Sequence, residues 1–175
     1  MGGISVEADG VNHCEIGDCR EIMLAYCAGV IDSDGTIGVK RSTYAMRHNN
    51  GGQATYSERV CVRQVERHAV ELLKQLFGGS FGVRGANAKR GKPLYEWCVT
   101  DKRAALCLKE ILPYLRIKWA QAANCLMLRE HKEASAKARI GFGRGHVGAS
   151  ARTLEHSQLM ELRYQRAKAL NRVGV

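Results

Sequence analysis

The sequence predicts one α+β domain in which helices cover one face of a four-stranded antiparallel sheet. Two hairpin-like pairs of alternating segments are each preceded and followed by segments with helical spacing. The chain has 175 residues, 45% of them apolar and 25% charged, which suits a single core. The expected order is therefore an αββαββα core followed by further C-terminal helices.

The first half of the core begins at Asp18, where Asp18 and Glu21 form a variant of the capping box. Apolar residues then recur at helical intervals until Gly35, which should end the helix. Two strands follow, and the sequence HNNGGQ between them supplies turn residues. The expected elements are a helix over residues 18–34, strands over 36–47 and 57–64, and a helix over 66–77.

The second half repeats a hairpin and then becomes helical. ANAKRGKP separates its two strands, Asp101 is placed to cap the next helix, and Pro113 should break that helix. We expect strands over 80–85 and 94–100 and helices over 101–112, 119–137 and 153–170. The domain organisation is a flexible lead-in over 1–17, a core over 18–138, and a Gly/Arg-rich linker with a C-terminal helix over 139–175, which belong to the same domain.

The net charge favours a polyanionic partner. Lysine and arginine number 27 against 17 acidic residues, which gives a formal charge of +10 and a pI near 9.5. A membrane surface or no specific partner would also be compatible with charge alone. However, no apolar run approaches the roughly 20 residues of a membrane helix, and the first residues lack a signal-peptide pattern. We therefore expect a cytoplasmic or organellar protein that is not secreted.

The seven cysteines do not form a recognisable framework. Their number is odd and none are arranged as Cys-x-x-Cys, which argues against both a disulfide scaffold and a zinc site. Cys14 and Cys19 have no matching second pair or ordered histidines. The expectation is that the cysteines are reduced and mostly packed.

Asp32 and Asp34 occupy the last turn of the first predicted helix, where the helix dipole disfavours acids by a few tenths to about 1 kcal/mol each. A divalent cation with hard oxygen ligands, such as Mg²⁺, would compensate. Alternatively, one or both simply cap the turn before Gly35. The sequence leaves both interpretations open.

The same helix carries small residues at intervals of four: Ala25, Gly29 and Ser33. Such a stripe allows another helix to approach closely. If that helix belongs to a second copy of the chain, a two-fold axis brings two Asp34 carboxylates together. Packing within the monomer would explain the spacing equally well.

The segment CAGVIDSDG, Cys27 to Gly35, resembles the signature of the LAGLIDADG homing endonucleases. Cys27, Val30 and Ser33 depart from that signature conservatively, and the following TIGV fits the family as well. Only one such motif occurs in the chain. The resemblance therefore implies a homodimer that cuts both strands of a long, pseudo-palindromic DNA site and promotes intron mobility.

The resemblance also implies a set of catalytic residues. Asp34 would hold the metal and the scissile phosphate, and Ser33 would offer its backbone carbonyl to the metal. Gln64, just after the second strand, and Lys118, in LPYLRIKWAQAAN, match the glutamine and lysine that accompany the acid in the family. The expected cofactor is Mg²⁺, and Mn²⁺ or Ca²⁺ can occupy the same site. The residues expected at the dimer interface are Ala25, Gly29 and Ser33.

One face of the sheet should read DNA. If Ile37, Val39, Val60 and Val62 face the core, alternation sends polar and basic residues to the other face, and a twisted ribbon of this kind fits the major groove. Each of these residues would also suit a solvated strand face. The expected DNA contacts are Gly38, Lys40, Ser42, Tyr44, Ser57, Arg59, Cys61, Arg63, Arg84, Lys89, Arg90, Lys92 and Glu96.

Three alternatives remain compatible with the sequence. An RNA maturase that assists intron splicing would use the same basic sheet, which makes intron RNA a possible second partner. A DNA-binding regulator could keep the scaffold without cleaving. A structural RNA-associated protein would explain the charge but not the acids at the helix end. The C-terminal helix would either contact the nucleic-acid backbone or brace the fold.

Overall fold

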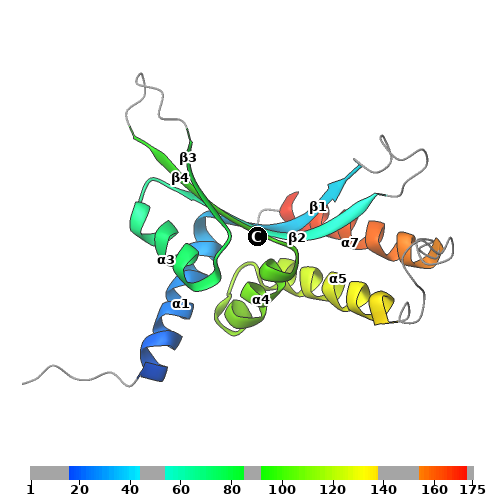
Figure 1. Cartoon of the computed structure of the whole chain (residues 1–175), viewed down its shortest axis with the longest axis horizontal. Coiled ribbons are helices and arrows are strands. Elements are labelled where there is room, and N and C mark those ends of the chain that lie inside the picture. Colours follow the sequence, from blue (N-terminus) through cyan, green and yellow to red (C-terminus); the bar gives the residue numbers. More distant parts are fainter. Residues whose placement is uncertain (1–15, 44–53, 85–91, 138–153, 173–175) are drawn as a thin grey trace, which may run out of the picture.

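The computed structural model describes residues 16–43, 54–84, 92–137 and 154–172. A single four-stranded antiparallel sheet lies at the centre of this part of the chain, and the expected α+β architecture is confirmed. Figure 1 shows the two hairpins diverging on one side and most helices gathered on the other. In chain order the elements are α1 (Ile16–Asp34), β1 (Gly35–Ser42), β2 (Thr55–Gln64), α3 (Arg67–Phe77), β3 (Ser80–Arg84), β4 (Leu94–Thr100), α4 (Asp101–Ile111), the 3₁₀ turn η1 (Leu112–Tyr114), α5 (Trp119–Lys137) and α7 (Leu154–Arg172).

The strand order is β1-β2-β4-β3, so the two hairpins meet through β2 and β4. Val60 pairs with Ile37 on one side and Val99 on the other, and all three are buried beneath the sheet. Arg59 pairs with Gly38 and Thr100 on the opposite face, which we call the open face. Residues two apart along a strand share a face. The predicted alternation of the first two strands is therefore confirmed.

The junction between α1 and β1 contains no loop, because the helix ends at Asp34 and the strand begins at Gly35. A Cβ atom at Gly35 would lie 2.6 Å from the carbonyl oxygen of Ile31. Only glycine fits this close approach. The strand starts one residue earlier than predicted and ends at Ser42 rather than Arg47, residues 44–53 lying outside the described part.

The core is built from the covered face of the sheet and the helices below it. Trp97, Leu73, Leu108 and Ile31 are fully buried and come from four different elements. Trp97 also donates a hydrogen bond from Nε1 to the carbonyl of Gly78 at 2.6 Å, so its polar atom is satisfied. This core fixes the end of α1 against the sheet.

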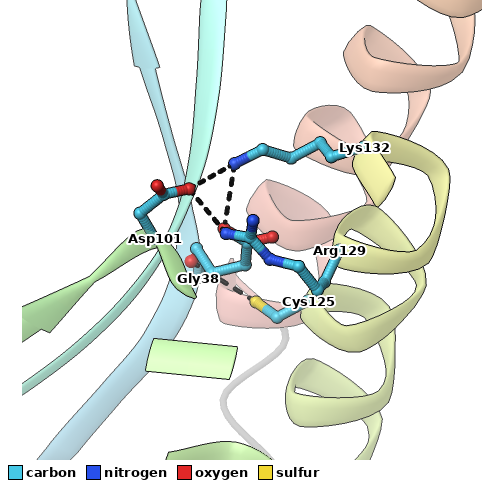
Figure 2. A network of polar contacts seen from close by, with 6 residues as sticks. Gly38, Asp101, Cys125, Arg129 and Lys132 are labelled. Carbon is cyan, nitrogen blue, oxygen red and sulfur yellow. Dashed lines mark hydrogen bonds and ion pairs between the residues drawn. The ribbon is translucent and has the colours of Figure 1, made fainter. Parts of the chain in front are cut away.

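A buried ion-pair network joins α5 to the sheet (Figure 2). Glu58 on β2 is fully buried and accepts a 2.6 Å bond from Arg129, and Lys132 lies 3.2 Å from the same carboxylate. Both cations also bind Asp101 at 2.5 Å. The sequence analysis missed this network, although Arg129 and Lys132 lie at a helical interval of three on one face of α5.

Two predicted helix caps are wrong, although α4 begins at Asp101 as expected. The first helix begins at Ile16 rather than Asp18, because an acid is favourable anywhere in the first turn and the capping pattern does not fix the cap itself. Asp101 does not cap α4 either: the cap position is Thr100, and the Asp101 carboxylate binds Arg129 and Lys132 instead. The ion pairs outweigh the local capping preference.

The expectation that all cysteines are reduced is wrong for two of them. Cys61 on β2 and Cys98 on β4 are cross-strand partners and form a disulfide on the open face. Sequence spacing could not reveal this pair, because the two cysteines are 37 residues apart and only the sheet aligns them. Cys27, Cys107 and Cys125 are buried thiols, as expected, whereas Cys19 is exposed.

Helix α7 lies against α5 and along the outer side of β1 (Figure 1). Asn171 donates to the carbonyl of Ile37 at 3.1 Å, which satisfies a group on an edge strand, and Asn124 donates to the carbonyl of Arg163 at 2.9 Å. Met160 and Ala167 are buried. None of the described helices combines the length and apolar character that a membrane span requires.

Candidate nuclease site and nucleic-acid interface

The three residues that the resemblance assigned to catalysis meet at the C-terminal end of α1. Asp34 is exposed, and its Oδ2 accepts a hydrogen bond from Nε2 of Gln64 at 2.5 Å. Lys118 comes from the segment before α5 and places its Nζ on the last carbonyls of α1. Asp34, Gln64 and Lys118 thus lie together at the end of α1, although long stretches of sequence separate them.

Lys118 closes the end of the helix. Its Nζ donates to the carbonyls of Ile31 at 2.9 Å and Asp32 at 2.6 Å, and it lies 3.4 Å from that of Ser33. Burial lowers the pKa of Lys118, and the nearby carboxylates of Asp32 and Asp34 partly offset this effect. The ammonium group therefore supplies positive charge where the helix dipole is negative.

Asp32 has a structural role that differs from both interpretations left open by the sequence, a metal ligand and a cap of the turn before Gly35. Its side chain is buried and accepts backbone hydrogen bonds from Arg116 at 2.7 Å, Ile117 at 3.1 Å and Lys118 at 2.9 Å. These amides precede the first turn of α5, where a carboxylate is favourable. Asp34 is therefore the acid left available for a ligand.

The donors around Asp34 fit a hard cation only in part. Its carboxylate and the carbonyl of Ser33 are oxygen donors of the kind Mg²⁺ prefers. No cluster of three or more acidic, histidine or cysteine side chains able to hold a metal occurs among the residues with described positions. A phosphate or a second Asp34 would supply further oxygen donors.

The open face carries most of the predicted DNA contacts. Lys40, Arg59 and Arg63 point to it from β1 and β2, and Gly38, Ser42 and Ser57 share the face. Arg84 and Glu96 lie on it in the second hairpin, and Lys92 is exposed just before β4. Three predicted contacts, Tyr44, Lys89 and Arg90, lie outside the described residues.

Two of the predicted contacts are less accessible than expected. Cys61 is buried and forms a disulfide with Cys98. The Nε of Arg59 lies 3.0 Å from the Sγ of Cys61. Glu96 is only 7% exposed, because it forms ion pairs with Arg63 at 3.3 Å and with Arg84. Its carboxylate orients two arginines on the open face and is shielded from direct contact with a base.

The small-residue stripe of α1 is uncovered. Ala25, Gly29 and Ser33 are exposed, and a Cβ at Gly29 would meet no described atom within 4 Å. Ile22 and Tyr26, on the same side of the helix by spacing, are 64% and 50% exposed. Figure 1 shows the first turns of α1 extending beyond the other helices. Nothing in the described part of the chain explains why this face is small and apolar.

Comparison with known proteins gives a consistent picture of the fold. No family model and no curated protein matches the sequence. The homing endonuclease I-CvuI in complex with its target in the presence of 2 mM Ca matches with a TM-score of 0.53 and 20% identity, over 87% of this chain and 97% of that chain. The archaeal intron-encoded homing endonuclease I-Vdi141I complexed with DNA matches with a TM-score of 0.53 and 11% identity, over 89% and 98%.

These similarities define a structural class. The chain has the fold of the LAGLIDADG homing endonucleases, as the resemblance of CAGVIDSDG predicted. At these identities the comparison establishes the architecture alone. The functions of individual residues must be argued from the site.

Proposed function

We propose that this chain is one subunit of a homodimeric, Mg²⁺-dependent homing endonuclease that cuts both strands of a long pseudo-palindromic DNA site and so promotes intron mobility. The observation that carries the proposal is the exposed Asp34 carboxylate at the edge of a basic open face, with Gln64 2.5 Å away and Lys118 on the same helix end. An acid at a helix C-terminus costs stability, and a ligand-binding role accounts for it.

The open face supports double-stranded DNA as the substrate. Lys40, Arg59 and Arg63 extend from a twisted two-stranded ribbon of a width that suits the major groove. Arginine side chains recognise guanine edges, while lysines pair with phosphates. The relatives with the same fold were solved with DNA bound, which is consistent with this assignment.

In the proposed mechanism, Asp34 and the carbonyl of Ser33 would hold the divalent ion beside the scissile phosphate. A bound Mg²⁺ would lower the pKa of a water molecule and stabilise the leaving oxygen. Gln64 would orient the attacking water, since its amide lies against Asp34. Lys118 would offset the negative charge of the phosphate from its position on the end of α1.

The uncovered stripe of α1 supports the homodimer. One chain supplies a single Asp34 to the site, whereas cutting two strands requires two such centres. Packing of α1 against its copy through Ala25, Gly29 and Ser33 would bring the two carboxylates together near the two-fold axis. Among the described residues, a Cβ at Gly29 would meet nothing within 4 Å, which agrees with an intermolecular role for that glycine.

The decisive experiment is cleavage of a randomised duplex library with Mg²⁺, using the wild type and Asp34→Asn, followed by sequencing of the cut ends. We expect the wild type to cut one near-palindromic site and Asp34→Asn to bind that site without cutting. Sequence-specific binding without cleavage by the wild type in any divalent metal would indicate a regulator. Selective binding of intron RNA would indicate a maturase.

A second experiment tests the dimer. Gly29→Leu should give a folded monomer in analytical ultracentrifugation and lose cleavage, because the monomer has room for the side chain. Ala134→Leu, at an exposed position of α5, is the matched control and should remain dimeric and active. Dimerisation of Gly29→Leu with wild-type affinity would exclude this interface.

A further inference from the structure

A groove of about 530 Å³ separates the open face from the last two turns of α7. Asp34 lies at its border, and Lys40, Arg59 and Arg63 contribute to the sheet side. Lys168 and Arg172 line it from α7. Five basic side chains and one carboxylate therefore face a common space, which is suited to a polyanion.

Helix α7 is held firmly enough to present these side chains at a fixed place. Asn171, beside Arg172, donates to the carbonyl of Ile37, and a Cβ at Gly38 would lie 3.2 Å from its Nδ2. One turn earlier, Ala167 is 3% exposed, so the residue before Lys168 is packed against the body of the protein. The glycine in β1 thus allows the close seating of α7 beside the open face.

Neither Lys168 nor Arg172 forms an ion pair with a carboxylate in the described part of the chain. Lys168 lies over the ring of Tyr164 at 5.6 Å, and Arg172 is in the last turn of α7, where a cation is favourable. These local interactions explain why the residues are tolerated. They do not explain why both line the same groove as Asp34.

We propose that Lys168 and Arg172 bind phosphate groups of the DNA backbone close to the scissile phosphate at Asp34. Helix α7 thereby extends the DNA-binding surface beyond the edge strand β1. This inference rests on the proposed function, since it takes duplex DNA as the ligand. Contacts of this kind fix the position of the backbone without reading sequence. They should strengthen binding to any duplex.

The test measures the salt dependence of binding to a 30-base-pair duplex of random sequence, with EDTA to prevent cleavage. Wild type is compared with Lys168→Gln/Arg172→Gln by fluorescence anisotropy between 50 and 200 mM salt. The control, Lys109→Gln/Arg166→Gln, removes the same charge from exposed positions outside the groove. Thermal unfolding of all three proteins verifies that the variants are folded.

Loss of two phosphate contacts should reduce the slope of log K against log salt by about 1.8 per bound subunit, and the control should keep the wild-type slope. An unchanged slope, or equal losses in both variants, would overturn the inference while leaving cleavage by the wild type intact. A loss seen only with structured RNA would also overturn it. If the wild type neither binds nor cuts any duplex, the proposed function itself fails.

Discussion

Asp32 and Lys118 cap each other's helices. The Asp32 carboxylate accepts the backbone N–H of Lys118 at 2.9 Å, and the Lys118 ammonium donates to the backbone carbonyl of Asp32 at 2.6 Å. Each side chain thereby satisfies free backbone groups at the end of one helix. The exchange explains how an acid and a lysine 86 residues apart position the candidate nuclease site.

The first prediction separates the two acids of the motif. Asp32→Ala leaves three amides before α5 without their acceptor and should lower the free energy of unfolding by about 2–3 kcal/mol. Asp34→Asn, at an exposed position, should change it by less than about 0.5 kcal/mol. Urea denaturation monitored by circular dichroism measures both. Equal destabilisation by the two substitutions would contradict the assigned roles.

The second prediction concerns specificity on the open face. Glu96→Gln removes the charge that holds Arg63 and Arg84, so both arginines gain freedom to bind phosphates. The ratio of cognate to random-duplex affinity should fall by roughly tenfold, which is 1.4 kcal/mol. Competition binding at fixed salt gives this ratio. Glu71→Gln, which frees Arg67 on α3, is the matched control and should leave it unchanged.

The third prediction concerns the buried network of Figure 2. Arg129→Met leaves the carboxylate of Glu58 buried without its closest partner and should cost about 3–5 kcal/mol of stability. The double variant Glu58→Gln/Arg129→Met should recover part of this loss, because no buried charge remains unpaired. Arg67→Met breaks an exposed pair and should cost less than about 0.5 kcal/mol. A double variant as unstable as Arg129→Met alone would refute the explanation.

The fourth prediction is a pH dependence. Partial burial tends to raise the pKa of Asp101, but hydrogen bonds from Lys132 and Arg129 outweigh it and lower the pKa to about 2. A carboxyl group with a depressed pKa stabilises the fold above its unfolded pKa, near 3.8, and this contribution disappears as the pH falls towards 2.

The Asp101 side chain is 54% exposed, so screening limits the effect to about 1 kcal/mol. Wild type should therefore exceed Asp101→Asn in stability at pH 6, and the difference should shrink as the pH falls from 4 through 2. Chemical denaturation across this range provides the test. A difference at pH 2 that is as large as at pH 6 would exclude the ionic explanation.

The fifth prediction concerns the cysteines. With Cys61 and Cys98 joined, thiol titration of the unfolded protein should find two fewer thiols without reductant than after reduction. Reduction should lower the free energy of unfolding by about 2–4 kcal/mol, because the bridge closes a long loop in the unfolded chain. The variant Cys61→Ser/Cys98→Ser should show the lower stability with or without reductant. Seven titratable thiols in the oxidised protein would contradict the pairing.

Periodicity and local signals predicted the fold class and most elements because they are properties of neighbouring residues. Ile37 and Val60 alternate with polar residues, and their burial follows directly. By contrast, the role of Asp32 depends on amides 84–86 residues further along the chain, and Glu58 depends on Arg129 in another helix. Local sequence does not specify such partners, so these interactions required the tertiary structure.

The candidate site likewise combines features that the sequence predicted with features that required the tertiary structure. Gln64 and Lys118 were identified through resemblance to a family motif, and the structure brings both to the end of α1. The sequence left open whether the C-terminal helix contacts the nucleic-acid backbone or braces the fold, because Lys168 and Arg172 resemble ordinary cations of a solvated helix. Only the seating of Asn171 against β1 shows that they face Asp34.

The direct passage from α1 to β1 at Gly35 has a consequence for how such a protein can change its target. The residue that would hold the metal and the strand that would read the sequence form one continuous rigid piece. Substitutions close to Gly35 would therefore disturb the proposed cutting geometry, whereas those near Ser42 would do so least. New target preferences should accumulate from the far end of the strand inward, and the base pairs nearest the cut should be the last to be respecified.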